Sequence, residues 1–442
     1  MSRWLVVVAS VVATTSEVVA NETRKEVARD EVAVMLELRL SLPPGDEVVV
    51  SFADSDDLPG LAASVVREHA ARFATLSGGG CDAEERAIPR EALLACHVGR
   101  VLRELRSEVA ARSTRVVDYV EFRTARRGGP RALVATFTFG LRYEALFAWY
   151  FRASVLRYCE RHGHDFRQYL QPLDGFRSAG TRAQGLLAQK LLVATRPFSE
   201  GYDAVVWVDG DVYVADHAPD VVAACPDTGV VCGTNQNAQV NARLRLYAQV
   251  TRGLEQRGAT WYADRGIAFE EDDVLQSGVL VFRPKHHGAL CREIYEAIIA
   301  DDHYRRHGED QPFFSYEFLR RGLVHFLRWE FNAVWQIHHH FVALRPDDDD
   351  DKVEILARLL FVANFVHFTS MADVHLLPEA ARRAADVAAK IDPRPDRNRN
   401  RTGSSCIRVA TAASEPPLVL ACGDRASADD EPTRPPPRPL PG

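Results

Sequence analysis

The stretch that decides the fold runs from Tyr202 to Val214 and reads YDAVVWVDGDVYV. Five apolar residues, Ala204 to Val208, lead directly into two aspartates that flank a single glycine, Asp209 and Asp211. A short apolar run of this kind predicts a buried strand, and open α/β sheets bind their ligands beyond the carboxyl ends of their strands. The sequence therefore places two carboxylates where an α/β protein is expected to hold a ligand.

The Asp-x-Asp pattern suits a divalent cation that is shared with a phosphate-bearing substrate. Such a cation takes only one or two protein carboxylates and keeps its other positions for phosphate and water. Gly210 lets the backbone turn and approach a ligand closely. The pattern alone is weak in a chain with 61 acidic residues. Its place at the end of a Val-Val-Trp-Val strand is the specific part of the signal, and it predicts a metal site.

Segments typical of strands and of helices alternate from Arg131 to about Lys390, which predicts βαβ units in a mixed, largely parallel sheet. The expected strands cover residues 132–139, 166–170, 204–208, 229–232 and 279–282. The expected helices cover residues 143–161, 182–195 and 241–257. The fold class is therefore α/β, with a Rossmann-like sheet flanked by helices.

Composition shifts divide the chain into four parts. Residues 1–20 are expected to form a signal peptide, 32–124 a small α+β accessory module, 131–392 the α/β domain, and 393–442 a Pro- and Arg-rich tail that is mostly disordered. In the module, the alternating runs VMLELRLSL and EVVVSF predict strands, and helical patterns follow at residues 61–76 and 90–111. No chemical motif marks the module, so we expect a recognition or packing role for it.

The amino terminus has the three regions of a secretory signal. Arg3 provides a basic start, the segment from Trp4 to Ala13 is apolar, and Val18 and Ala20 fit the small positions before a cleavage site. The apolar run is short of the ~20 residues that cross a bilayer. We expect a cleaved signal and a place in the lumen of the secretory pathway; an uncleaved anchor and a plain apolar strand are the alternatives.

The overall charge, the sequons and the cysteines indicate which partners and which cellular compartment to expect. A formal charge of −7 argues against a protein that mainly binds nucleic acid. Sequons begin at Asn21 and Asn400, and the acidic run Asp347 to Asp351 is expected to be an exposed loop. Eight cysteines allow local bridges, while reduced buried cysteines are the alternative. The candidate bridges are Cys81–Cys96, Cys225–Cys232 and Cys406–Cys422, and Cys159 and Cys291 are expected in the core.

Together with the Asp-x-Asp strand, six further segments resemble nucleotide-sugar glycosyltransferases of the GT-A fold. The parallels lie in the glycogenin and lipopolysaccharide galactosyltransferase group and in the galactomannan galactosyltransferase and xyloglucan xylosyltransferase group. The segments, in order, are YCERHG (158–163), AQKLLVATRPF (188–198), LQSGVLVFRP (275–284), GEDQPFFSY (308–316), WEFNAVW (329–335) and NFVHFTS (364–370). The resemblance covers neither the first ~130 residues nor the tail.

The resemblance implies a metal-dependent transfer of a hexose or pentose from a nucleotide-sugar, most simply a UDP-sugar, to a hydroxyl acceptor on a glycan, protein or other molecule. It implies Mn²⁺ or Mg²⁺ as cofactor, with retention of anomeric configuration. The metal ligands would be Asp209, Asp211 and His367, with Asp211 as the direct carboxylate. An imidazole ligand suits Mn²⁺ better than Mg²⁺.

The remaining site residues follow from the same resemblance. Donor binding would involve Lys190, Asp209, Gln276, Ser277 and Gly278, the catalytic pair would be Asp310 and Gln311, and Asn332 would be an acceptor-side or a loop-shaping residue. Gln276 departs from the family's asparagine by one methylene, so a hydrogen bond to the sugar would shift. Each residue also has a plainer interpretation: Lys190 as a solvated lysine, Asp310 as a helix-capping residue and His367 as part of the core.

Two other function classes remain open from the sequence. One is a degenerate relative that binds nucleotide-sugar or glycan without turnover. The other is a metal-dependent phosphodiesterase or nucleotidyltransferase, although the segment after the first α/β strand, TFTFGLRYEAL, has only Gly140 where a nucleotidyltransferase has a glycine-rich loop. The triplet His338 to His340 is not expected to bind one metal ion, because adjacent histidines on a strand point to opposite faces; we expect an ordinary position in a loop or at the surface.

Overall fold

A computed structural model describes most of the chain between residues 35 and 390. The described residues are 7–9, 35–42, 46–53, 57–74, 90–112, 119–124, 131–174, 183–195, 199, 201–226, 229–239, 262–300, 310–342, 349–390, 408–409 and 418–419. The chain forms two compact units, Met1–Ala388 and Ala389–Gly442. In the second unit, strands β14 (Arg408–Val409) and β15 (Leu418–Val419) pair antiparallel. The predicted disorder of the tail otherwise concerns residues outside the described part.

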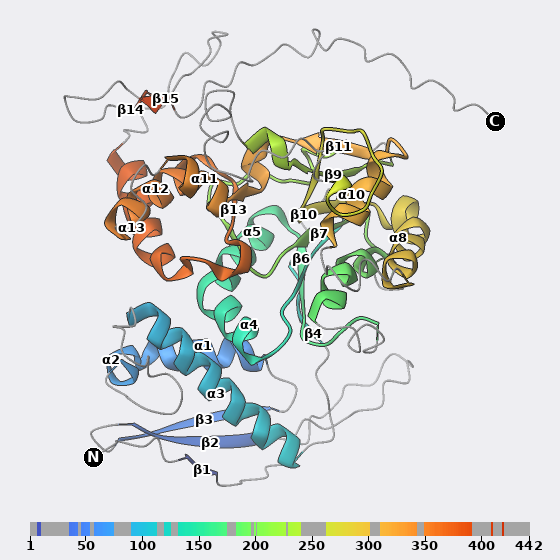
Figure 1. The fold of residues 1–442 in the computed structure, drawn as a ribbon. Coiled ribbons are helices and arrows are strands. Elements are labelled where there is room, and N and C mark those ends of the chain that lie inside the picture. The colour runs from blue at the N-terminus through green and yellow to red at the C-terminus, as the bar shows by residue number, and fades with distance from the viewer. Residues whose placement is uncertain are drawn as a thin grey trace. The chain divides into compact units, whose positions relative to one another are not determined.

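A seven-stranded sheet forms the centre of the first unit (Figure 1). Its order is β11-β9-β10-β7-β5-β6-β4, and β4 and β10 run opposite to the other five strands. The strands are β4 (Tyr119–Phe122), β5 (Ala132–Phe137), β6 (Asp165–Tyr169), β7 (Ala204–Val208), β9 (Val231–Asn235), β10 (Leu275–Phe282) and β11 (Val324–Leu327). This architecture confirms the predicted α/β class with a mixed, mostly parallel sheet, and it is consistent with a GT-A-like, Rossmann-type arrangement.

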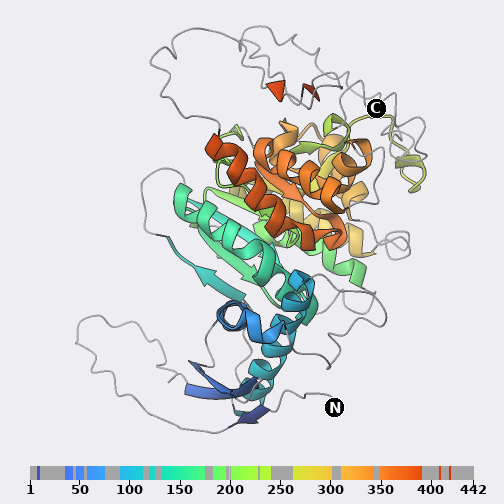
Figure 2. The same ribbon diagram turned by 90° about the vertical axis from the view of Figure 1, so that its left-hand side faces the viewer.

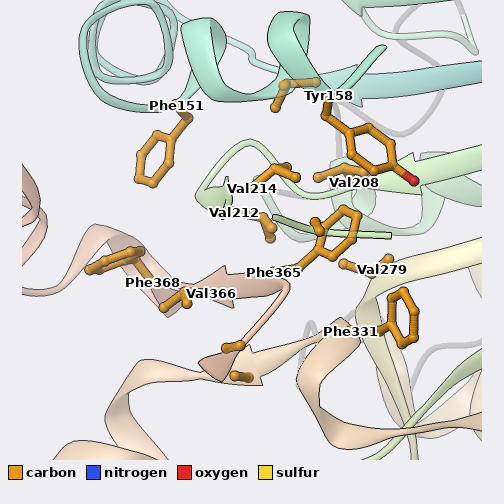
Figure 3. Packing of buried hydrophobic residues seen from close by; sticks show 14 of the residues in the cluster. Phe151, Tyr158, Val208, Val212, Val214, Val279, Phe331, Phe365, Val366 and Phe368 are labelled. Carbon is orange, nitrogen blue, oxygen red and sulfur yellow. The ribbon is translucent and has the colours of Figure 1, made fainter. Parts of the chain in front are cut away.

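Both faces of the sheet are buried, which explains why its strands read as continuous apolar runs. On β7, Val206 and Val208 face one core, while Val205 and Trp207 face the other. The first core also contains Phe151, and Figure 3 shows that ring among the buried side chains. Alternate residues thus serve opposite layers, as the period-two geometry of a strand requires.

Helices cover the two faces. The continuous helical stretch α4 (Leu141–Leu146), η1 (Phe147–Phe151) and α5 (Arg152–His162) contributes to the first core, and in Figures 1 and 2 it lies over the sheet. The second core is covered by η3 (Ala183–Thr195), α8 (Pro284–Ala300) and α10 (Gln311–Leu319). Further helices are η5 (Gln236–Gln239), η6 (Trp329–Phe331), α11 (Trp335–Val342), α12 (Asp349–Val362), η7 (Thr369–Met371), η8 (Val374–Leu376) and α13 (Leu377–Lys390).

The strand order reverses beside β5. From β5 the chain passes to β6 on one side and then to β7 on the other, and all three strands are parallel. A reversal of this kind opens a crevice at the carboxyl ends of the two strands concerned. The Asp-x-Asp turn follows β7 directly, so the topology positions both carboxylates beside the carboxyl ends of β7 and β5.

A second, three-stranded sheet lies against this edge. It consists of β12 (Ala333–Val334), β13 (Phe365–His367) and β8 (Val212–Val214), with β13 in the middle. β8 follows the Asp-x-Asp turn directly, and it pairs antiparallel with β13 so that Val212 opposes His367. This register brings a histidine from late in the chain next to the two aspartates.

The amino-terminal module has the expected α+β composition. Strands β1 (Val7–Ala9), β2 (Met35–Leu42) and β3 (Asp46–Ala53) form an antiparallel sheet, and helices α1 (Leu58–Glu68), α2 (Ala70–Phe73) and α3 (Arg90–Arg112) accompany it. Its apolar core includes Ala145 and Ala148, which belong to the helical stretch α4–η1 of the α/β domain. The module and that helix therefore share one core.

Several local expectations need correction or remain outside the described residues. Residues 183–195 form the expected helix, in the 3₁₀ form, and residues 241–257 are not described. The histidine triplet lies in α11, not in a loop, because WQIHHHFV continues one helix. The acidic run is exposed from Asp349 to Asp351, but these residues begin α12, where their charge suits the helix amino terminus.

The amino-terminal end of the first unit and its cysteines add further findings. Part of the predicted signal peptide, Val7–Ala9, forms β1 and pairs with β2, so the alternative of an apolar strand has a structural counterpart; cleavage stays a prediction. Cys225 and Cys232 form the expected bridge, and Cys96 is also disulfide-bonded. The free thiols of Cys159 and Cys291 are buried, as expected. Within the described residues, no helix has the length and apolarity needed to cross a bilayer.

Glu144 links stability to pH at the shared core. Its carboxyl on α4 is fully buried and pairs with Arg106 of α3, and burial raises its pKa from 4.5 to about 7 although Arg106 opposes the shift. Between these values the folded chain holds a proton that the unfolded chain releases, so the free energy of unfolding falls as the pH rises from about 4.5 to about 7. We expect Glu144→Gln to remove about 1–3 kcal/mol of that fall, measured by urea denaturation at pH 5 and pH 8.

The exposed Glu160 provides the control for this experiment. Glu160→Gln is expected to keep the pH dependence of the wild type, because its carboxylate is solvated in the folded chain. Identical slopes for Glu144→Gln and the wild type between pH 5 and pH 8 would contradict the raised pKa.

Candidate active site

Two carboxylates and one imidazole converge beyond the end of β7. Asp209, Asp211 and His367 each offer one ligand atom, and these atoms lie within 4.8 Å of one another. His367 Nε2 is 3.1 Å from Asp211 Oδ1 and 3.7 Å from Asp209 Oδ2. In the described part of the chain this is the one group of three such residues that could hold a metal ion. All three predicted metal ligands are therefore brought together.

Backbone hydrogen bonds fix this geometry. The amide of Val212 donates to the Asp209 carbonyl at 3.1 Å, which closes the turn that carries the two aspartates. The amide of Phe368 donates to the Asp211 carbonyl at 2.8 Å, and the amide of Asp209 donates to the Gly278 carbonyl at 2.8 Å. The turn is thus tied on one side to β13 and on the other to β10, so the three side chains are held by secondary structure instead of a free loop.

Two glycines allow the close approach of these segments. A Cβ on Gly210 would lie 3.0 Å from the Phe137 carbonyl oxygen, so a side chain there would press on the end of β5. A Cβ on Gly278 would lie 2.3 Å from His367 Nδ1 and 3.1 Å from Asn332 Nδ2. Gly278 therefore provides the space in which the imidazole stands, a role that needs no contact with a substrate.

Replacement of Gly278 by alanine tests this interpretation. We expect Gly278→Ala to displace the His367 ring and to weaken Mn²⁺ binding about 10- to 100-fold, the size of effect seen when the support of a metal ligand is lost. Isothermal titration calorimetry with MnCl₂ measures the change. Gly99→Ala is the matched control, because its Cβ would make an ordinary 3.5 Å contact with Ala145. Unchanged Mn²⁺ affinity in Gly278→Ala would contradict the role assigned to the glycine.

Lys190 lies buried between two acidic residues. Its Nζ is 3.2 Å from Asp209 Oδ1, 3.1 Å from Asp310 Oδ2 and 3.1 Å from the Ser277 hydroxyl oxygen. Burial acts to lower the pKa of the ammonium, but the charges of Asp209 and Asp310 outweigh it and the pKa is raised. Lys190 is thus a buried cation on η3, and the alternative of a solvated lysine is wrong.

Charge also favours the protonated form of His367. Burial acts to lower the pKa of its imidazole, but the carboxylates of Asp211 and Asp209 outweigh that effect and raise it. The histidine is 4 % exposed. Buried apolar neighbours do surround it, yet its Nε2 faces carboxylates, so the ring is more than a core residue.

Asp310 precedes α10 without capping it. Its side chain makes no capping hydrogen bond, and its backbone is already helical, which rules out the simple capping interpretation. The carboxylate instead forms the ion pair with Lys190. The neighbouring Gln311 donates through Nε2 to Gln236 Oε1 at 2.6 Å and lies 3.4 Å from the Ser277 hydroxyl. The predicted catalytic pair and the predicted donor-binding segment therefore meet around one lysine.

The side chain of Gln276 forms its hydrogen bonds within the protein. Its Oε1 accepts hydrogen bonds from the Gly278 amide at 2.7 Å and from Asn332 Nδ2 at 2.8 Å. The Gln276 side chain thus holds the Gly278 backbone and the Asn332 side chain beside His367. The backbone carbonyl oxygen of Asn332 in turn accepts a hydrogen bond from Gln239 Nε2 at 2.8 Å. Both residues are buried within a polar network that links β10, η5 and β12.

Sequence reasoning missed three members of the site. Trp207 donates from Nε1 to Asp209 Oδ1 at 2.6 Å, and Gln236 and Gln239 anchor Gln311 and Asn332. The contact between Trp207 and Asp209 could have been predicted from the sequence, because residues two apart on a strand share a face. The contacts of the two glutamines could not, since η5 carries no motif and meets its partners only through the tertiary fold.

Comparison with known proteins gives matches among solved structures only. No family model matches this sequence, and no curated protein sequence does. One similar structure is a glycosyltransferase involved in the glycosylation of the major capsid of PBCV-1, with 14% identity and a TM-score of 0.35 over 58% of this chain and 100% of the other. Another is the bifunctional glycosyltransferase WbbM, with 13% identity and a TM-score of 0.35 over 73% of this chain and 64% of that one. Similarity at this level assigns neither a substrate nor a residue role.

Proposed function

We propose that the protein is a metal-dependent glycosyltransferase that uses a nucleotide-sugar donor. The observation that carries the proposal is the meeting of Asp209, Asp211 and His367 within 4.8 Å at the switch point of an α/β sheet. The sequence motifs that resemble GT-A enzymes supply the reaction class. The buried pair of Lys190 and Asp310 beside the carboxylates adds the groups that the same resemblance assigns to the donor.

The donor set fits a divalent cation. Two carboxylates provide the hard oxygen ligands that Mn²⁺ and Mg²⁺ prefer, and the imidazole of His367 shifts the preference towards Mn²⁺. The direct carboxylate ligand would be Asp211, which lies nearer to the imidazole, while Asp209 is held by Trp207 and Lys190. A bound cation would offset the negative charge of the diphosphate as the sugar departs.

The protein's own residues would orient the donor. Lys190 holds Asp209 and Asp310 at fixed positions, since its ammonium contacts both carboxylates. Ser277 and Gln311 provide a hydroxyl and an amide next to this pair for the hydroxyls of a sugar. By the same resemblance, Asp310 and Gln311 would lie under the sugar ring and bind its hydroxyls. Retention is proposed from the resemblance alone.

The substrates and the compartment are proposed from the resemblance and from the amino-terminal segment, respectively. The donor would be a UDP-sugar or another nucleotide-sugar, and the acceptor a hydroxyl of a glycan, a protein or another molecule. If the amino-terminal segment acts as a signal, the protein would act in the lumen of the secretory pathway, in the Golgi or the endoplasmic reticulum. The sequons at Asn21 and Asn400 would then be accessible to glycosylation.

A panel of nucleotide-sugars tests the function. Purified protein would be incubated with each donor, with and without Mn²⁺, and release of nucleoside diphosphate would be measured. We expect Mn²⁺-dependent hydrolysis of at least one donor and faster release when an acceptor glycan is present. Binding of a donor without release would support the degenerate relative instead. Release of sugar 1-phosphate would favour phosphodiester cleavage if nucleoside monophosphate appears with it, and nucleotidyl transfer if the nucleotide is found on an acceptor.

A further inference from the structure

A cavity lies away from the candidate active site, where the amino-terminal module meets the α/β domain. Its volume is about 560 Å³, within the range of pockets that hold small molecules. Its walls come from α3, from α4 with η1, and from the segment after β13. Figure 1 shows α3 and α4 next to each other. None of the residues of the candidate active site lines this cavity.

The lining is apolar with cationic groups and, among the described residues, no carboxylate. Apolar walls come from Ala95, Ala145, Leu146, Met371 and Val374. The cations are Arg100, Arg103 and Arg142, with His375 as a fourth basic group. His375 has a counter-charge in Asp349 at 3.9 Å, and Arg100 contacts His97. Arg103 and Arg142 are exposed and have no ion-pair partner among the described residues.

A buried hydroxyl in the cavity also lacks a partner. Tyr150 lines the cavity, its side chain is 7 % exposed, and its hydroxyl makes no hydrogen bond to the described residues. Burying a polar atom without a hydrogen-bond partner costs free energy, and a bound water or ligand can supply the missing hydrogen bond. Within the described part of the chain, the cavity therefore offers one unsatisfied donor inside and two unpaired guanidinium groups on exposed side chains.

We infer that this cavity binds a single-chain amphiphile with a phosphate or carboxylate head group. Arg103 and Arg142 match either head group, because guanidinium forms paired, charge-assisted hydrogen bonds with both. The apolar walls accept the chain, and the Tyr150 hydroxyl satisfies its hydrogen bond with an oxygen of the head group. The assignment is independent of the proposed glycosyl transfer, since it concerns separate residues and requires no metal.

Calorimetry in EDTA tests the inference without the candidate active site. The probes are octyl phosphate and octanoate below their micellar concentrations, compared with octanol and inorganic phosphate. We expect at least one amphiphilic anion to bind tenfold or more tightly than both comparison compounds. The Arg103→Gln/Arg142→Gln variant is expected to weaken that binding about tenfold or more, and Tyr150→Phe to weaken it by a smaller factor.

A matched control removes two arginines outside the lining, in the variant Arg157→Gln/Arg358→Gln, and it should bind like the wild type. Four outcomes would overturn the inference: no binding of either anion at millimolar concentration, equal binding of octanol, equal binding of inorganic phosphate, or full affinity in the Arg103→Gln/Arg142→Gln variant. Because metal is absent from the assay, the result does not depend on whether nucleotide-sugar turnover is found.

Discussion

Asp211→Asn is expected to abolish Mn²⁺-dependent turnover of a nucleotide-sugar, with a loss of about 10²–10³-fold or more, as when one stabilising group is removed from a catalytic site. The amide keeps the shape of the side chain but removes the charge that faces His367 Nε2 at 3.1 Å. Calorimetry with MnCl₂ should show that binding is lost at concentrations that saturate the wild type. Release of nucleoside diphosphate measures the effect on the reaction.

Asp216→Asn provides the matched control, because Asp216 follows β8 closely but is exposed and pairs with Arg157. We expect it to keep wild-type metal binding and turnover. The thermal unfolding midpoint of both variants should stay near that of the wild type in EDTA. If Asp211→Asn retained wild-type activity and Mn²⁺ affinity, the metal site proposed here would be wrong.

Lys190→Met is expected to lower the free energy of unfolding by about 3–5 kcal/mol at pH 7.5 in EDTA, the cost of breaking a buried ion pair by removing one partner. The ammonium is 3.2 Å from an oxygen of Asp209 and 3.1 Å from one of Asp310; Lys190 and Asp310 are buried, and Asp209 is half-buried. Without it, two carboxylates remain close together with no buried cation between them. Urea denaturation measures the loss.

A second substitution separates this electrostatic effect from a loss of packing. In the double variant Lys190→Met/Asp310→Asn, one of the two carboxylates is neutral, so we expect about 1–2 kcal/mol of stability to return. The exposed Lys285 gives the control, and Lys285→Met should change stability by less than about 0.5 kcal/mol. A loss below about 1 kcal/mol for Lys190→Met would show that the lysine is more hydrated than the structure indicates.

Local sequence patterns predicted the scaffold of the site well. The apolar run before Asp209 is a central strand, and the alternation of strands and helices gave the sheet class, because side-chain period and burial are properties of neighbouring residues. The sequence also supplied His367 as a partner of the aspartates, but only through the order of motifs that resemble a known family. No periodicity indicates that β13 pairs with β8, since this register is set by the tertiary fold.

Other features escaped because they depend on distant contacts. The ion pair between Lys190 and Asp310 joins residues that are far apart in the chain, and each residue alone has an ordinary surface interpretation. The 3₁₀ form of residues 183–195 has no distinguishing pattern in the sequence. Helix α12 begins within an acidic run that reads as a loop, because charge repulsion in the run and its attraction to a helix amino terminus act in opposite directions.

The core that the amino-terminal module shares with Ala145 and Ala148 has a practical consequence for protein engineering. An expression clone that starts at residue 131 would leave these alanines facing solvent and would strip Glu144 of its guanidinium partner on α3. Exposed apolar surface of this kind promotes aggregation. A truncated protein that starts at residue 131 should therefore be poorly soluble. Fragments that retain residues 35–112 keep Ala145 and Ala148 buried in the shared core.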